Sequence, residues 1–133
     1  GELAEGQIWE ATMFAAHYKL DNLCIIVDIN GLQIDGRTCD VMNTEPVDAK
    51  FAAFGCDVVK INGHDFQEME TAFAKFHANH GTGKPTAILM TTTKGKGVSY
   101  MEDQAGWHGK APNDEEYAQG MAELAAARAA LEV

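Results

Sequence analysis

Along this chain, segments in which apolar residues recur with the spacing of a helix alternate with short apolar runs typical of strands. Residues 5–19 carry apolar side chains such as Ile8 and Met13 on an imperfect helical stripe. Residues 23–29 form a short run that is apolar on both faces, which is typical of a strand buried inside a parallel sheet. The chain therefore opens with a predicted helix followed by a predicted strand.

The rest of the chain continues this alternation. A polar loop is predicted over 30–45 and a Gly- and Lys-containing loop over 93–113, with Pro46 and Asp65 each at the start of a helix. Further helices are predicted over 47–54 and 66–80, with a last one opened by residues 113–116 and ending at about 132, and further strands over 57–61 and 86–92. This order predicts an α/β fold, a parallel sheet with crossover helices. Three strands would leave both sheet edges open, so we expect the domain to be incomplete at its N-terminus, with neighbours upstream or in another chain.

Composition narrows the class of protein. The 133 residues carry a formal net charge of −10, which argues against nucleic acid and anionic membranes as partners. No apolar run reaches the roughly 20 residues that a bilayer crossing requires. The three cysteines, at positions 24, 39 and 56, have no C-x-x-C spacing, so neither a disulfide framework nor a zinc site is indicated. This usage favours the reducing cytoplasm as the compartment.

A carboxamide follows the first predicted strand directly. Asn30 and Gly31 stand at its carboxyl end, which is where open α/β sheets bind ligands. The Asn30 side-chain oxygen could coordinate Mg²⁺ or Ca²⁺, with a backbone carbonyl beyond it completing the coordination, since hard cations favour oxygen donors. Alternatively, Asn30 and Gly31 form an ordinary turn. Both interpretations are compatible with the local pattern.

Two glutamates in the first predicted helix are candidates for a site between molecules. Glu5 and Glu10 lie five positions apart and so point about 140° apart around the helix axis. They could face two different partners, one a cofactor and the other a neighbouring subunit. They could also be ordinary charges on a helix surface, which is the usual place of glutamate.

The loop after the third predicted strand holds a candidate lysine and a candidate histidine. In Lys94-Gly95-Lys96-Gly97 the glycines let backbone and an ammonium group approach a phosphate, although such a tetrapeptide also occurs in exposed loops. His108 shares this loop and could donate to a phosphate or transfer protons, or it could be structural. The other four are weaker candidates, because they lie in helices, just after one or in a helix-start turn: His17, His64, His77 and His80.

Taken together and in order, these segments resemble a thiamine-diphosphate enzyme, and more narrowly the diphosphate-binding domain of transketolases. Residues 1–7 (GELAEGQ) resemble the end of the family's GDGEL-x-EGQ, and residues 28–36 (DINGLQIDG) resemble its D-x-N-G-x-x-I-D-G. The match continues through Gly63-His64-Asp65, residues 92–97 (TTKGKG) and residues 107–112 (WHGKAP). The lysine at position 94 and the WHGKAP variant are similar to split transketolases, whose two halves are separate subunits.

The resemblance implies a role for individual residues. The Asn30 side chain and the Leu32 carbonyl would bind Mg²⁺, which would bridge the two phosphates of thiamine diphosphate. Ile34 would pack near the thiazolium ring, and His108 would lie near the substrate. The implied cofactor-binding residues are Gly1, Glu5, Gly31, Ile34, Lys94 and His108. The implied catalytic residues are His108 with Glu5 and Glu10, the two glutamates joining a carboxylate network between subunits.

The implied activity is transfer of a two-carbon ketol unit from a ketose phosphate to an aldose phosphate. Residues 1–133 would be the C-terminal portion of the diphosphate-binding domain, in a homo- or hetero-oligomer with a pyrimidine-binding subunit. The Asp of the family's Gly-Asp-Gly would precede Gly1, so we expect this chain alone to be inactive and to bind cofactor poorly. Two alternatives stay open: a synthase of the 1-deoxyxylulose-5-phosphate type, and a non-catalytic dimerisation module.

Overall fold

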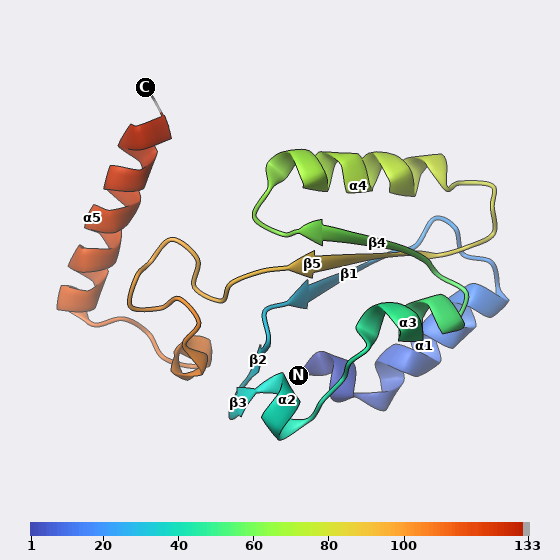
Figure 1. Cartoon of the computed structure of the whole chain (residues 1–133), viewed down its shortest axis with the longest axis horizontal. Coiled ribbons are helices and arrows are strands. Elements are labelled where there is room, and N and C mark those ends of the chain that lie inside the picture. The colour runs from blue at the N-terminus through green and yellow to red at the C-terminus, as the bar shows by residue number, and fades with distance from the viewer. Residues whose placement is uncertain (132–133) are drawn as a thin grey trace.

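A three-stranded parallel sheet lies at the centre of the computed structural model, which describes residues 1–131 (Figure 1). The strands are β1 (Cys24–Ile29), β4 (Asp57–Asn62) and β5 (Thr86–Thr91), arranged in the order β1-β5-β4. Leu89 of β5 lies opposite Val27 of β1 on one side and Lys60 of β4 on the other. The predicted α/β fold with parallel strands and crossover helices is confirmed.

Helices cover both faces of this sheet. α4 (Phe66–Ala78) lies against one face, and α1 (Gly6–His17) and α3 (Val47–Ala53) lie against the other (Figure 1). Asp65 caps α4 as predicted, because its carboxylate accepts hydrogen bonds from two backbone N–H groups of the first turn. None of the helices within residues 1–131 combines the length and the hydrophobicity that a bilayer crossing requires.

The core is divided by the central strand into two clusters. Successive side chains of β5 point to opposite faces of the sheet. Leu89 therefore packs in the cluster of the fully buried Phe51 on α3, whereas Ile88 packs in the cluster of Ala72 on α4. Burial of these apolar side chains is the main favourable term for folding and places the ends of the strands with respect to the helices.

The first strand is less buried than its sequence predicts. Ile26 is 52% exposed and Asp28 is also exposed, while Val27 between them is buried. The prediction that this strand is covered on both faces is therefore wrong for residues 1–131, because Ile26 lies on the face of α4, and α4 packs mainly over β4 at the other edge of the sheet. β5 has the predicted pattern instead, since its first four residues are all buried.

Short elements occupy two regions that the sequence did not resolve. The predicted loop 30–45 contains a two-stranded hairpin of β2 (Leu32–Gln33) and β3 (Gly36–Arg37), followed by the one-turn helix α2 (Thr38–Val41). A 3₁₀ turn, η1 (Glu2–Ala4), precedes α1. Elements of two to four residues are too short to leave a periodicity in the sequence.

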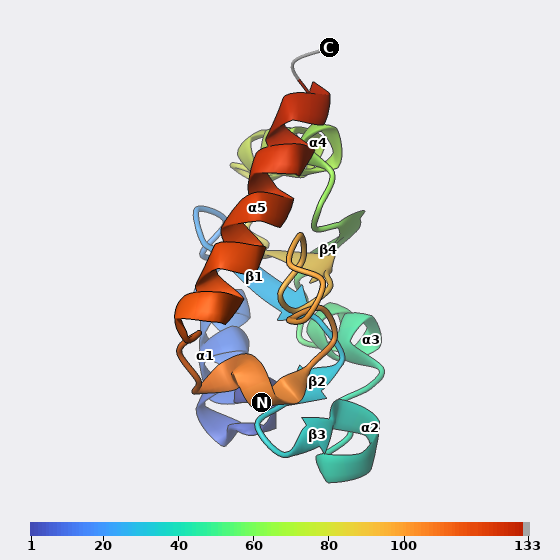
Figure 2. The same ribbon diagram turned by 90° about the vertical axis from the view of Figure 1, so that its left-hand side faces the viewer.

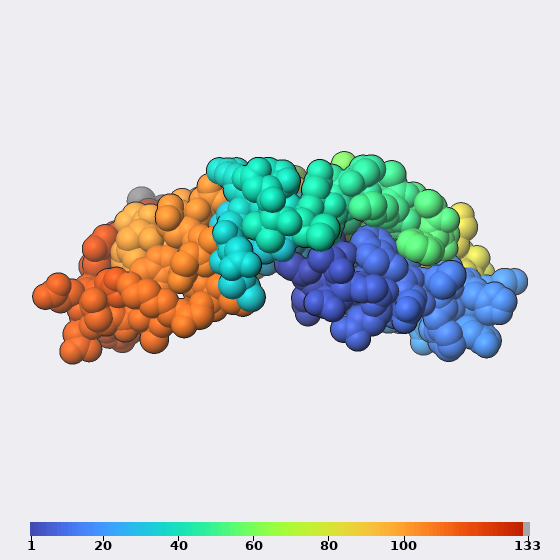
Figure 3. All heavy atoms as spheres, turned by 90° about the horizontal axis from the view of Figure 1, so that it is seen from below, coloured from blue at the N-terminus to red at the C-terminus, as the bar shows by residue number. Residues whose placement is uncertain are grey.

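The C-terminal section lies beyond the carboxyl ends of the strands. Its loop contains the 3₁₀ turn η2 (Ala105–His108) and leads to α5 (Asp114–Leu131), which stands apart from the helices that cover the sheet (Figures 1 and 2). Ser99 of this loop donates to the Glu123 carboxylate through both its N–H and its hydroxyl. The molecule is therefore elongated, with this section at one end (Figure 3). Residue 132, the predicted end of the last helix, lies outside the described residues.

Candidate functional site

A cavity of about 480 Å³ opens where the strands end, between three segments that are far apart in the sequence. Its walls come from Gly1 to Glu5, from the hairpin after β1, and from Lys94 and His108 in the long loop. Figure 3 shows the dark blue first residues, the cyan hairpin segment and the orange loop side by side, with a hollow between the first two. The volume is within the range of small-molecule sites in proteins, and the position is the one where α/β sheets bind ligands.

The structure brings most of the predicted site residues together. Seven of the nine line this cavity, namely Gly1, Glu5, Asn30, Leu32, Ile34, Lys94 and His108. Gly31 lies in an adjoining groove of about 180 Å³ along β1, and Glu10 lines neither the cavity nor the groove. Predicted residues from three separate segments of the sequence thus face one space.

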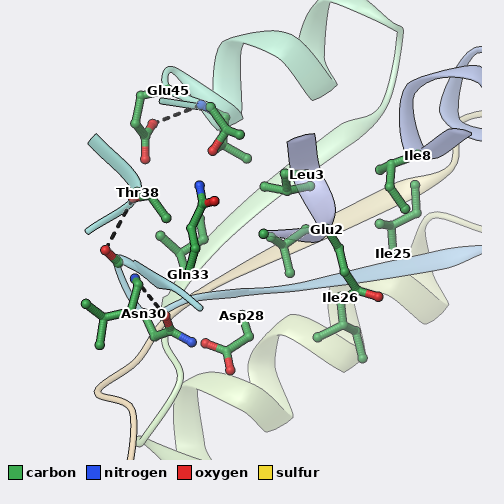
Figure 4. A pocket seen from close by; sticks show the side chains of 17 residues that line it. Glu2, Leu3, Ile8, Ile25, Ile26, Asp28, Asn30, Gln33, Thr38 and Glu45 are labelled. Carbon is green, nitrogen blue, oxygen red and sulfur yellow. Dashed lines mark hydrogen bonds between the residues drawn. The ribbon is translucent and has the colours of Figure 1, made fainter. Parts of the chain in front are cut away.

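The adjoining groove changes from polar to apolar along its length. Figure 4 shows Asn30 and Asp28 at the end nearer the cavity and Ile8 and Ile25 at the other end. Gly1, Asn30 and the hairpin border both spaces, so the groove and the cavity meet at the end of β1. The Glu2 carboxylate lies between these two ends.

Asn30 forms a turn of its own. Its Oδ1 accepts a hydrogen bond from the Leu32 N–H at 2.9 Å, and Gly31 takes the left-handed backbone, at a φ of +74°. The Thr38 N–H donates to the Gly31 carbonyl at 2.9 Å and closes the hairpin. The predicted turn is therefore present. It leaves the ligand interpretation open, since a carboxamide oxygen has two lone pairs and Leu32 occupies one of them.

The hairpin places an apolar side chain on the cavity wall. Ile34 lies between β2 and β3 and is 67% exposed, although it lines the cavity. Gln33 anchors the base of the hairpin, because its Nε2 donates to the Met42 carbonyl at 2.9 Å. An exposed aliphatic group held this way offers a contact surface to an apolar ring.

Glu5 and Glu10 face different surroundings. Glu5 is the N-cap residue of α1 but makes no capping hydrogen bond with its side chain, and it lines the cavity. Glu10 is exposed on the same helix and lies outside the cavity. Because Glu5 has extended backbone and precedes the first residue of α1, the two side chains are not separated by helix geometry alone.

The two lysines of the KGKG segment differ in their partners. Lys96 pairs with Glu102 at 3.3 Å. A hydrogen bond from the Gly97 N–H, together with Lys96, holds the pKa of Glu102 below its usual range. Lys94 lines the cavity, and its ammonium group makes no ion pair or hydrogen bond with the described residues. Lys94 is therefore the cation of this segment that is available to an anionic ligand.

The backbone around Lys94 is held by its neighbours. The Asp103 N–H donates to the Lys94 carbonyl at 3.0 Å. Gly95 has a φ of +71°, and a Cβ at this position would lie 2.6 Å from the Cβ of Met101, so only glycine fits. On the other side, the Thr92 hydroxyl donates to the Asp28 carboxylate at the end of β1. Lys94 thus extends from a loop whose backbone is fixed by hydrogen bonds and close packing.

His108 is placed by the tryptophan before it. The Trp107 Nε1 donates to the Tyr100 carbonyl at 3.0 Å, and the two rings lie 5.2 Å apart. On the other side, the Lys110 ammonium lies 4.1 Å from the centre of the Trp107 ring. His108 itself is exposed and lines the cavity. Trp107 therefore serves as the anchor that holds His108 at the cavity.

The cavity combines charged side chains with neutral oxygens. Glu2, Glu5 and Asp35 line it together with Lys94, so carboxylates outnumber the permanent cation. Within residues 1–131 no three His, Cys, Asp or Glu side chains come together as a metal cluster. Neutral oxygens from Asn30 and Leu32 suit Mg²⁺, which at phosphate sites takes few protein ligands and completes its shell from phosphates and water.

Some residues of the site escaped the sequence interpretation. Gln33 and Asp35 line the cavity, and the sequence assigned them no role although both lie within the matched segment 28–36. His64, which the sequence ranks among the weaker histidines, accepts a hydrogen bond from the Thr93 N–H beside Lys94. No local pattern indicates that contact.

The parallel sheet, the cavity at its carboxyl end and the available lysine define an α/β domain with a small-molecule site. The family model described as "Transketolase, thiamine diphosphate binding domain" matches residues 1–130. The chain belongs to this family, and the resemblance found in the sequence is confirmed.

Similar proteins include single subunits of transketolases. The chain is 43% identical over 124 residues to an apulose-4-phosphate transketolase subunit of Actinobacillus succinogenes, covering 93% of this chain and 44% of that one. It is 42% identical to the 6-deoxy-6-sulfo-D-fructose transketolase subunit SqwG of a Clostridium species, again over 93% of this chain and 44% of that one. The chain thus spans less than half the length of these curated relatives.

A solved structure supports the fold. Transketolase from Campylobacter jejuni superposes with a TM-score of 0.83 at 33% sequence identity, over 92% of this chain and 19% of that one. The three-stranded sheet and its covering helices therefore have the arrangement found in that protein.

Proposed function

We propose that this chain is part of a split transketolase and binds the diphosphate of thiamine diphosphate through Mg²⁺. In this proposal a two-carbon ketol unit passes from a ketose phosphate to an aldose phosphate. Residues 1–133 form the C-terminal portion of the diphosphate-binding domain. A separate subunit supplies the pyrimidine-binding domain, which agrees with the naming of the Actinobacillus relative as one subunit of its enzyme.

One observation carries the proposal: the cavity gathers a neutral-oxygen turn, an available lysine and a histidine at the carboxyl end of one sheet. The turn comes from the end of β1 and the lysine from the loop after β5, and these two strands are direct neighbours. Oxygen donors and an ammonium group are what a Mg²⁺–diphosphate needs. The family match supports the same cofactor.

The residues of the chain have distinct roles in this proposal. Asn30 Oδ1 and the Leu32 carbonyl hold the metal, and Lys94 offsets the remaining phosphate charge. Ile34 packs near the thiazolium ring and orients it. When bound, thiamine diphosphate supplies the chemistry of two-carbon transfer. His108 exchanges a proton at its imidazole with a substrate oxygen near the mouth of the cavity.

The remaining predicted residues act at the margins of the cofactor. Gly1 and Gly31 bring backbone close to the diphosphate side of the site. Glu5 lies on the cavity wall, where it joins the carboxylate network that couples neighbouring subunits. Glu10 lies outside the cavity and reaches that network from the subunit surface.

The test is a ketol-transfer assay with the protein, its pyrimidine-binding partner, Mg²⁺ and thiamine diphosphate. Donors include common ketose phosphates, apulose 4-phosphate and 6-deoxy-6-sulfo-D-fructose. We expect Asn30→Ala to lower transfer by at least roughly 100-fold, because loss even of groups behind a metal ligand costs roughly 10- to 100-fold.

Asn43→Ala is the matched control. Asn43 makes the same kind of turn as Asn30, since its Oδ1 accepts from the Glu45 N–H at 3.0 Å, but it lies outside the cavity. Both substitutions remove one turn hydrogen bond, and only Asn30→Ala removes the proposed metal ligand. Normal turnover of Asn30→Ala refutes the metal assignment, and absence of transfer with every donor refutes the reaction.

The same assay separates the alternatives. A synthase of the 1-deoxyxylulose-5-phosphate type would condense pyruvate with an aldose phosphate rather than pass a ketol unit between sugars. A dimerisation module would bind no thiamine diphosphate. The transketolase names of the relatives favour ketol transfer over both.

A further inference from the structure

A histidine from outside the cavity reaches the loop that carries Lys94. His64 lies in the turn between β4 and α4, and its Nε2 accepts a hydrogen bond from the Thr93 N–H at 2.7 Å. The two residues are 29 positions apart in the sequence. This bond joins the turn at the end of β4 to the loop at the end of β5.

The turn that presents His64 is itself fixed. The His64 N–H donates to Asn62 Oδ1 at 3.0 Å, and the Gly63 N–H donates to the Thr91 carbonyl at 2.8 Å. A Cβ on Gly63 would lie 2.5 Å from the Thr92 side chain, so the turn sits directly against the end of β5. These contacts fix the backbone of the turn and so place the imidazole within hydrogen-bonding distance of the Thr93 N–H.

The hydrogen bond specifies the chemical form of the imidazole. Because Nε2 accepts, its lone pair is used and the proton of the neutral ring is on Nδ1. An amide oxygen at the end of a glutamine side chain could accept the same N–H, whereas an alanine could not. This difference provides a conservative substitution that keeps the acceptor.

The bonded peptide directly precedes Lys94. The Thr93 N–H is held by His64, and the Lys94 carbonyl is held by the Asp103 N–H at 3.0 Å. The Lys94 ammonium has no partner of its own within residues 1–131, so the direction of its side chain depends on the backbone that carries it. The hydrogen bonds at the Thr93 N–H and at the Lys94 carbonyl together fix the conformation of that backbone.

We infer that His64 is a positioning residue that orients Lys94 toward the diphosphate. The inference rests on the proposed function, because it requires an anionic cofactor at Lys94. His64 does not touch the cofactor itself, and it does not line the cavity. It acts through the Thr93 peptide, and its loss weakens binding of the diphosphate without changing the groups that carry out the transfer.

The experiment compares His64→Ala, His64→Gln and His77→Ala in the assembled enzyme with Mg²⁺. His77 is an exposed histidine near the end of α4 and serves as the matched control. We expect His64→Ala to raise the half-saturating concentration of thiamine diphosphate about three- to tenfold, the factor typical of one lost hydrogen bond. The kcat at saturating cofactor should stay within about twofold of wild type, and His64→Gln should restore most of the affinity.

A double substitution tests the route through Lys94. If His64 acts by orienting Lys94, adding His64→Ala to Lys94→Gln should cost no further affinity, because the group being oriented is already gone. Circular dichroism and assembly with the pyrimidine-binding partner verify that each variant folds.

Several results would overturn the inference. One is a His64→Ala enzyme with unchanged cofactor affinity, and another is a His64→Gln enzyme that is as weak as His64→Ala. If the double variant showed the product of the two single fold-losses in cofactor affinity, His64 would act independently of Lys94, and this result would also refute the inference. An enzyme that transfers no ketol unit even with His64 intact would refute the proposed function, and the inference with it. An active wild type with unaffected variants would refute the inference alone.

Discussion

Gly63→Ala tests how closely the carboxyl ends of β4 and β5 approach each other. A Cβ at position 63 would lie 2.5 Å from Thr92 Cγ2 and 2.9 Å from Met90 Cβ, and 3.3 Å from the Thr91 carbonyl oxygen. Carbon atoms in contact normally lie about 3.5–4.0 Å apart. Met90 Cβ is attached directly to the central strand and cannot rotate away. Thr92 could rotate only by giving up the hydrogen bond between its hydroxyl and Asp28.

The expected cost follows from these contacts. Forcing an extra methyl group into a packed position costs about 1–3 kcal/mol, and a lost hydroxyl hydrogen bond adds about 1 kcal/mol. Gly63 has no left-handed φ, so alanine brings no backbone strain and gains about 0.4–1 kcal/mol from a less flexible unfolded chain. The net loss is about 1–3.5 kcal/mol. For a domain of this size that lowers Tm by roughly 4–14 °C.

Thermal and urea unfolding followed by circular dichroism measure this loss. Gly106→Ala is the matched control, because no heavy atom lies within 4 Å of a Cβ there and its φ is not left-handed. That variant should unfold within about 0.5 kcal/mol of wild type. If Gly63→Ala proves as stable as Gly106→Ala, the two strand ends do not approach as described. The position of the His64 turn against the end of β5 would then be refuted.

Two further substitutions test charged groups. Lys94→Gln should raise the half-saturating concentration of thiamine diphosphate about tenfold in titration calorimetry of the assembled enzyme, whereas Lys96→Gln, whose cation pairs with Glu102, should change it less than about twofold. Equal effects would contradict the assignment of Lys94. Glu123→Gln weakens the acceptor of the Ser99 hydroxyl and N–H, which hold the pKa of Glu123 below its ordinary 4.5. Because the folded pKa is lowered, the stability advantage of wild type should be complete above pH 4.5 and should vanish as the pH falls through that lowered pKa. Urea midpoints at about pH 7 and about pH 3 measure it, and an advantage that persists undiminished in acid would count against the reasoning.

The sheet and the main parts of the site could be predicted because they depend on local patterns. The apolar run of β5 and the N-cap Asp65 each have a signal within a few residues of sequence. Asn30 and Lys94 follow two predicted parallel strands, whose carboxyl ends lie at one edge of the sheet. The fold class therefore places both residues at the same edge of the sheet, whereas their proximity also requires that β1 and β5 are neighbours.

The features that escaped prediction depend on contacts between distant segments. The order β1-β5-β4 puts the last strand between the first two, and no periodicity in the sequence encodes that choice. The His64–Thr93 hydrogen bond requires both this order and a specific direction of one side chain. The exposure of Ile26 has a similar cause, since an apolar run predicts burial whether or not a helix packs over that part of the sheet.

The charges of the site bear on why the proposed function assigns roles to both a metal and a lysine. The chain has a net charge of −10, and three carboxylates line the cavity, so its electrostatic potential opposes an approaching diphosphate. One ammonium group cannot offset both the repulsion from these carboxylates and the negative charge of the phosphates. A divalent cation on neutral oxygens can, because Asn30 and Leu32 add no negative charge that would cancel it. In the proposed function the acidic cavity therefore favours a diphosphate bound as a metal complex, and the neutral turn at Asn30 supplies oxygens without adding negative charge.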